Sequence, residues 1–96
     1  MLVKSKLTPF DPAEMLDSSE SISFYLEEAF ASEDPELIAH ALGTVARAKG
    51  MTEVARKTGL SRESLYKALS AEGNPEFATI MKVMRALDLK ITAKAG

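Results

Sequence analysis

The segment SRESLYKALS, residues 61–70, concentrates side chains that suit contact with DNA. It carries an arginine, a lysine, a tyrosine and three serines within ten residues. Arginine and lysine bind phosphates and guanine edges, and hydroxyl groups bind phosphate oxygens. The candidate DNA-contacting residues are therefore Ser61, Arg62, Glu63, Ser64, Tyr66 and Lys67.

Several of these side chains have a distinct expected role. The Arg62 guanidinium can bind a guanine through two parallel hydrogen bonds, or it can bind a phosphate. Lys67 can reach either group, and Tyr66 offers both a hydroxyl and an apolar ring face. Glu63 would repel phosphates, so we expect it to accept from a cytosine amine or to pair with a neighbouring cation.

A helix that reads DNA needs a fixed support, and residues 52–70 have the pattern of a helix-turn-helix. Ala55 is small where the first helix meets the second, and Gly59 tolerates the positive φ of a tight turn. Leu60 is apolar where the second helix begins. The residues expected on its buried side are Val54, Leu65, Ala68 and Leu69. The alternative is a plain corner of two helices with a solvated outer face.

Five helices are expected, in a single all-α domain covering residues 1–96. Apolar residues recur at helical spacing within residues 17–32, 33–50, 52–57, 61–70 and about 75–87. The outer three of these ranges have apolar stripes that predict the core: Ile22, Tyr25, Leu26, Ala29 and Phe30; Ile38, Ala41, Leu42 and Val45; Phe77, Ile80, Met81, Met84 and Leu87.

Both ends of the sequence predict other structure. Residues 1–11 are expected to be extended, followed by a short helical turn at 12–16. Residues 89–95 alternate between apolar and polar, which indicates a short C-terminal strand. A lone strand needs a partner, either the N-terminal segment or a second copy of the chain.

Polar residues and glycines predict where the helices begin and end. The predicted N-caps are Asp17 (with Glu20 in a capping box), Asp34, Thr52, Ser61 and Asn74. Gly50 and Gly59 are expected to end helices in the left-handed conformation, and Asp88 is expected in a left-handed turn. Gly43, inside a helix, costs about 1 kcal/mol of propensity, and close packing against another helix is one reason to have it there.

Charge is divided unevenly along the chain. Residues 1–45 hold two lysines against nine acids, a net charge of −7, whereas residues 46–96 hold ten bases against five acids, a net charge of +5. The basic half suits a polyanion such as DNA, and the acidic half suits a cationic partner. The alternative is a chance imbalance between two solvated faces.

No residue pattern predicts an enzyme, a metal or a cofactor. The chain has no cysteine and a single histidine, His40, which we expect to be a packing or surface residue. The serines have no base at a catalytic spacing, and no glycine-rich phosphate loop is present. No apolar leader is evident, and no segment approaches the roughly 20 apolar residues of a membrane span. We therefore expect a cytoplasmic protein that is not an enzyme.

The stretches DPELIAHALGTVARAKGMTEVARKTGL, SRESLYKALS and GNPEFATIMKVMRAL resemble the antidote proteins, or antitoxins, of bacterial addiction modules. Those proteins carry a phage-repressor-like helix-turn-helix, and the resemblance runs from about Phe10 to Ile91. It implies a homodimer that binds operator DNA, represses its own operon and neutralises a RelE/ParE-like toxin. The readout would fall on the candidate residues of 61–67. Asp88 departs from the glycine that is common at this position in similar chains.

The resemblance also assigns the acidic half a partner, because a small ribonuclease-like toxin is basic. The residues expected to contact it are Asp17, Glu20, Glu27, Glu28 and Glu33. Two other functions fit the same residues. A stand-alone phage-repressor-like regulator would use the helix-turn-helix without a toxin. A pure protein-interaction module would show no salt-sensitive binding to DNA.

Overall fold

The computed structural model describes residues 16–70 and 72–96 of the chain. Within these residues the fold is all helical, as predicted, with five α-helices. They are α2 (Ser19–Ala31), α3 (Pro35–Lys49), α4 (Met51–Thr58), α5 (Arg62–Ala68) and α6 (Phe77–Ala86). The extended segment predicted over residues 1–11 and most of the helical turn predicted after it lie outside the described residues.

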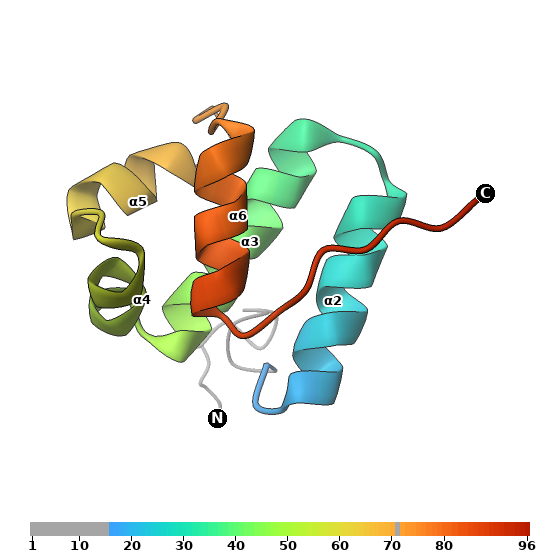
Figure 1. Ribbon diagram of the computed structural model, residues 1–96, viewed down its shortest axis with the longest axis horizontal. Coiled ribbons are helices and arrows are strands. Elements are labelled where there is room, and N and C mark those ends of the chain that lie inside the picture. Colours follow the sequence, from blue (N-terminus) through green and yellow to red (C-terminus); the bar gives the residue numbers. More distant parts are fainter. Residues whose placement is uncertain (1–15, 71) are drawn as a thin grey trace, which may run out of the picture.

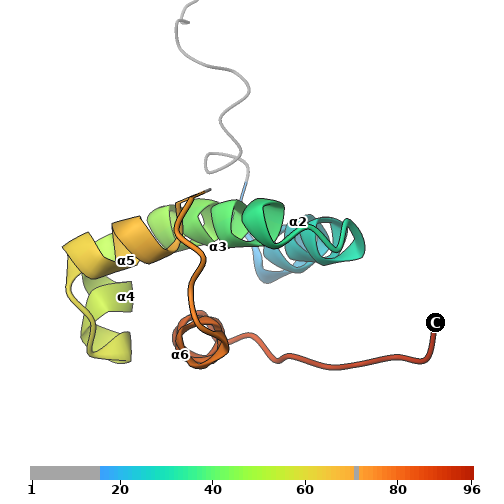
Figure 2. The same ribbon diagram turned by 90° about the horizontal axis from the view of Figure 1, so that it is seen from above.

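The helix α3 is the centre of the molecule. It packs against α2, α4 and α5, and Figure 1 shows it running behind α6 with α2 on one side and α4 and α5 on the other. Seen from above, α2, α3 and α5 lie in one layer and α6 lies in a second (Figure 2). The central helix therefore separates α2 from the α4–α5 pair.

The core forms around this central helix. Residues 41–46 of α3 are all buried, and Leu42 and Val45 have no exposed area. The buried hydroxyl of Thr44 donates to the His40 carbonyl at 3.1 Å, so it has a hydrogen-bond partner. Helices on several sides cover α3, which explains why it is buried well beyond the stripe predicted from helical spacing.

Three residues predicted for the core are exposed instead. Phe30, Phe77 and Met81 keep 38%, 66% and 44% of their surface in contact with solvent. In α6 the buried residues are Val83 and Met84, so the buried stripe is displaced from the predicted one. Helical spacing admits two neighbouring stripes on an apolar helix, and only the packing of α4 against α6 decides between them.

Two predicted N-caps and one predicted C-cap are confirmed. The Asp34 carboxylate accepts from the Glu36 N–H at 3.0 Å, and the Ser61 hydroxyl accepts from the Ser64 N–H at 3.0 Å. Gly59 ends α4 in the left-handed conformation, with φ of 79°. In each case the local sequence offers one strong capping candidate.

The cap of α2 differs from the prediction by one residue. Ser18, not Asp17, is the N-cap, and it forms a capping box with Ser21 in place of Glu20. The two serines bond reciprocally: the Ser21 N–H donates to the Ser18 hydroxyl at 3.1 Å, and the Ser18 N–H donates to the Ser21 hydroxyl at 3.2 Å. This exchange satisfies two backbone donors at the start of the helix.

The predicted caps at Thr52 and Asn74 are wrong. The helix α4 begins one residue before Thr52, and α6 begins three residues after Asn74; neither helix has a side-chain cap. Gly50 has φ of 109° and ψ of 111°, so it turns the chain directly from α3 into α4, although not in the predicted left-handed helical region. Asn74 has φ of 51°, which is incompatible with the extended conformation of an N-cap.

The strand predicted over residues 89–95 is not formed. Asp88 takes the predicted left-handed conformation, with φ of 62°, and the chain then runs past α2 without regular structure (Figures 1 and 2). Backbone atoms of residues 90–96 make no backbone hydrogen bond within the described part of the chain. No second strand lies beside them there, and an isolated strand has nothing to pair with.

Candidate nucleic-acid interface

A three-residue connection, residues 59–61, joins α4 to α5. The Gly59 N–H donates to the Ala55 carbonyl at 2.9 Å, and the positive φ of this glycine would strain any residue with a Cβ. The Thr58 hydroxyl accepts from the Leu60 N–H at 3.2 Å. Because these backbone donors are satisfied within the turn, the connection fixes the direction in which α5 leaves α4.

Buried apolar residues hold α5 against the body of the protein. Leu65 has no exposed area, and the exposed fractions of Leu69 and Val54 are 4% and 1%. The remaining residues of this inner side are half-buried: Ala55, Leu60 and Ala68. The inner face therefore lies where the sequence pattern predicted it.

All six candidate DNA-contacting residues are exposed to solvent: Ser61, Arg62, Glu63, Ser64, Tyr66 and Lys67. Arg62 and Tyr66 are four positions apart, as are Glu63 and Lys67, so they form two adjacent rows on the outer side of α5. Tyr66 keeps 46% of its surface exposed, which is high for an aromatic side chain. The outer side of α5 thus presents two cations, one carboxylate and one phenol.

Two of the candidate hydroxyls bond to each other. The Ser61 hydroxyl accepts from the Ser64 N–H and lies 2.9 Å from the Ser64 hydroxyl, to which it donates. Its proton is therefore in use, whereas the Ser64 proton points to no protein acceptor among the described residues. Ser64 is consequently the better placed of the two to donate to a ligand.

The cations of α5 are not neutralised by Glu63. Within the described residues the one ion pair joins Arg56 to Glu53 in α4, and neither Arg62 nor Lys67 takes part in another. The hydrogen bond from Arg56 lowers the pKa of Glu53, which keeps that pair charged. Arg62 and Lys67 therefore present their full charge to solvent.

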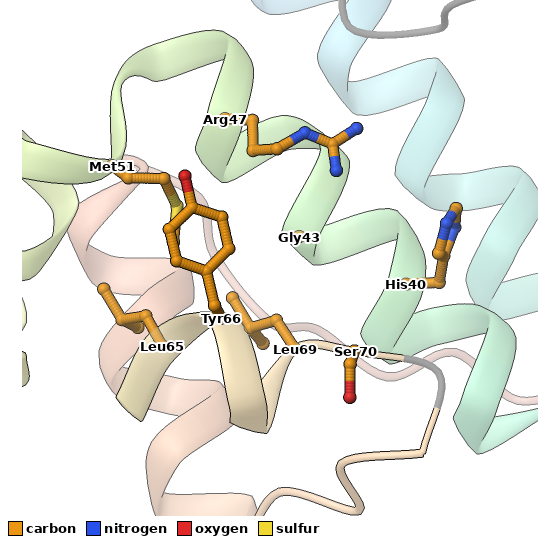
Figure 3. Close-up of a pocket in the computed structure, with 8 residues that line it drawn as sticks. All are labelled: His40, Gly43, Arg47, Met51, Leu65, Tyr66, Leu69 and Ser70. Carbon is orange, nitrogen blue, oxygen red and sulfur yellow. The ribbon is translucent and has the colours of Figure 1, made fainter. Parts of the chain in front are cut away.

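A pocket of about 260 Å³ lies between α5 and α3 (Figure 3). Gly43 permits this close approach, because a Cβ at this position would lie 2.9 Å from the Leu69 carbonyl oxygen. The pocket is lined by His40, Gly43, Arg47, Met51, Leu65, Tyr66, Leu69 and Ser70. The packing that the sequence offered as a reason for Gly43 is therefore present.

The same pocket brings two residues of α3 to the candidate interface that sequence reasoning did not place there. Arg47 and His40 are exposed and line the pocket together with Tyr66. Arg47 had been explained only by its place in the last turn of its helix, where a cation is favourable. No local pattern could reveal its proximity to Tyr66, because it depends on how α3 packs against α5.

The acidic residues expected to contact a toxin are exposed but do not form one cluster. Glu27 and Glu28 lie in the second half of α2, Glu20 lies in its first turn, and Asp17 precedes the helix. Glu33 lies in the connection to α3, with φ of 58°. The helix α2 stands on the side of α3 that faces away from α4 and α5 (Figure 1). The acidic residues and the α5 residues therefore belong to separate surfaces.

Two searches of the described residues concern other kinds of site. Across residues 16–70 and 72–96, no three histidine or acidic side chains gather in a way that could hold a metal ion. No helix in the same part of the chain is long and apolar enough to cross a membrane.

Comparison with known proteins gives a family. A protein of Haemophilus influenzae, described as an uncharacterized protein, is 55% identical over 85 residues, which cover 88% of either chain. No solved structure matches the chain. A family model described as a probable addiction module antidote protein matches residues 6–95. The match spans nearly the whole sequence, and the chain therefore belongs to the family of probable addiction module antidote proteins.

Proposed function

We propose that this protein is the antitoxin of a type II toxin-antitoxin module. It neutralises a small RelE/ParE-like ribonuclease toxin by masking it, and it represses its own operon by binding operator DNA. The observation that carries the proposal is the separation of two exposed surfaces, a cationic one on α5 and an acidic one on α2, by the central helix α3. Membership of the antidote family favours this function over that of a stand-alone repressor.

In the DNA-bound state α5 enters the major groove. Arg62 reads a guanine through a bidentate contact, and Glu63, which has no ion pair to Arg62 or Lys67, accepts from a cytosine amine. Lys67 and the Ser64 hydroxyl bind phosphates. Arg47, which lines the same pocket as Tyr66, adds a phosphate contact from α3. These contacts make the affinity fall steeply as the salt concentration rises.

A single α5 gives a small interface, so we propose that the protein binds DNA as a homodimer. Two copies related by a two-fold axis would read two half-sites separated by about 34 Å or a multiple of that distance. The operator is then a palindrome upstream of the protein's own gene. Binding to half a palindrome would be weaker than binding to the whole.

The DNA half of the proposal is tested by replacing Arg62. Arg62→Ala should weaken binding to the upstream DNA by about 1–3 kcal/mol, because a bidentate base contact is lost. Fluorescence anisotropy with labelled upstream DNA measures the change. Arg85→Ala is the matched control, since it removes the same charge from an exposed position in α6. An operator affinity that Arg62→Ala leaves unchanged, or that both variants lower equally, would contradict the proposed role of α5.

The toxin half is tested by reversing charge on α2. The double variant Glu27→Lys and Glu28→Lys should weaken toxin binding by at least about tenfold, because two exposed carboxylates that face a cationic partner become repulsive. Isothermal titration with the purified product of the neighbouring reading frame measures this. Glu72→Lys with Glu76→Lys changes the net charge equally at exposed positions outside α2. Equal affinities for the two double variants would show that α2 is not the contact surface.

A further inference from the structure

The groove between α2 and the segment formed by residues 88–96 is an apolar surface with no occupant in the chain. Its volume is about 710 Å³, with Leu26 and Met84 among its lining residues. Phe30 on the α2 side and Ile91 on the other are 38% and 42% exposed. Burying such side chains is favourable. The groove is therefore suited to apolar side chains from another molecule.

One wall of the groove is a stretch of backbone ready to pair. Residues 90–96 make no backbone hydrogen bonds within the described part of the chain, although their apolar and polar residues alternate as in a strand. Figure 2 shows this segment standing apart from the helices. Unpaired, extended backbone beside an apolar groove is the arrangement by which a protein accepts an added strand.

The charges of the other wall indicate what kind of strand fits. Helix α2 contains Glu20, Glu27 and Glu28 and no basic residue, and Glu27 lines the groove. None of the three is ion-paired in residues 16–70 and 72–96. Lys90 and Lys94 lie on the opposite wall. The strand that fits therefore has apolar side chains toward the groove and basic side chains where it meets α2.

We infer that residues 89–95 become a β-strand when the toxin binds, by pairing with an edge strand of the toxin. The apolar side chains of that strand fill the groove beside Phe30 and Ile91, and its lysines or arginines meet the carboxylates of α2. The inference rests on the proposed function, since the antidote family supplies the partner. It accounts for a strand pattern in a segment that forms no strand alone.

Proline substitution tests the pairing without disturbing the helices. Thr92→Pro and Ala93→Pro each remove a backbone N–H, and successive N–H groups of a strand point to opposite edges, so one variant strikes the pairing edge. At least one should weaken binding to the purified product of the neighbouring reading frame by about tenfold. Ile91→Ala should weaken it similarly, while Thr92→Ala and Phe77→Ala should stay within about twofold. In hydrogen exchange, amides of residues 89–95 should become protected in the complex.

Three outcomes separate the inference from the function it rests on. If both proline variants and Ile91→Ala bind like the unmodified protein, or residues 89–95 gain no protection, the inference is overturned while the antitoxin function stands. If these variants instead turn a dimer into a monomer in light scattering without losing toxin, a second copy occupies the groove and the inference is again overturned. If the unmodified protein does not bind the neighbouring product, the proposed function itself fails.

Discussion

At the scale of single residues, Gly43 shows how the size of one side chain sets the position of α5. Helix propensity alone says that alanine should stabilise this position by about 1 kcal/mol. The Cβ of alanine would, however, lie 2.9 Å from the Leu69 carbonyl oxygen and 3.3 Å from the Leu69 Cβ. Backbone cannot move aside as a flexible side chain can, so the steric effect outweighs propensity.

We therefore expect Gly43→Ala to destabilise the protein by about 1–3 kcal/mol, the usual range for an overpacked core. Urea unfolding followed by circular dichroism measures the change. Ala48→Gly, at an exposed position of the same helix, calibrates propensity alone and should cost about 1 kcal/mol. A Gly43→Ala protein that is more stable than the unmodified one would show that α3 and α5 are not in close contact.

Single residues also show where sequence reasoning about caps succeeds. Asp34, followed by a proline, and Ser61, which follows a glycine turn, are unambiguous signals and were identified correctly. At the start of α2, Asp17 and Ser18 are adjacent capping residues, and the choice between them depends on the reciprocal bonds of Ser18 with Ser21. Propensity ranks both residues similarly as caps, so composition cannot decide.

At the scale of helices and segments, the existence of each described helix was predictable and its surroundings were not. Periodic apolar residues predict five helices because each must bury one face. The position of Arg47 beside Tyr66 and the choice of Val83 over Met81 in α6 depend on neighbouring helices far along the chain. The strand at residues 89–95 was wrong for a related reason: the pattern is present, but strand formation requires a partner.

The α4–α5 pair carries a prediction at this scale. Leu65→Ala should destabilise the protein by about 2–5 kcal/mol, because a fully buried side chain that holds α5 in place is truncated. Thermal or urea unfolding measures it. Leu37→Ala is the matched control, since Leu37 is 45% exposed at the start of α3 and should cost far less. Similar losses for the two leucines would mean that α5 is not anchored through Leu65.

At the scale of the whole molecule, the uneven charge of the sequence becomes a spatial division. The long dimension of the protein is 43 Å, with α5 toward one end and α2 toward the other (Figure 1). Sequence reasoning anticipated the two charge classes, since these can be counted, but the side of the fold on which each lies depends on α3. Under the proposed function this separation lets a toxin bind at α2 without covering α5.

The antitoxin function is tested most directly by growth. The short reading frame beside this protein's gene is expressed in bacteria alone and together with this protein, and colonies are counted. We expect the neighbouring product to stop growth by itself and the protein to restore it, because masking of the toxin is its proposed function. A neighbouring product that is harmless, or one whose toxicity this protein does not relieve, would contradict the antitoxin function and leave a stand-alone repressor as the better interpretation.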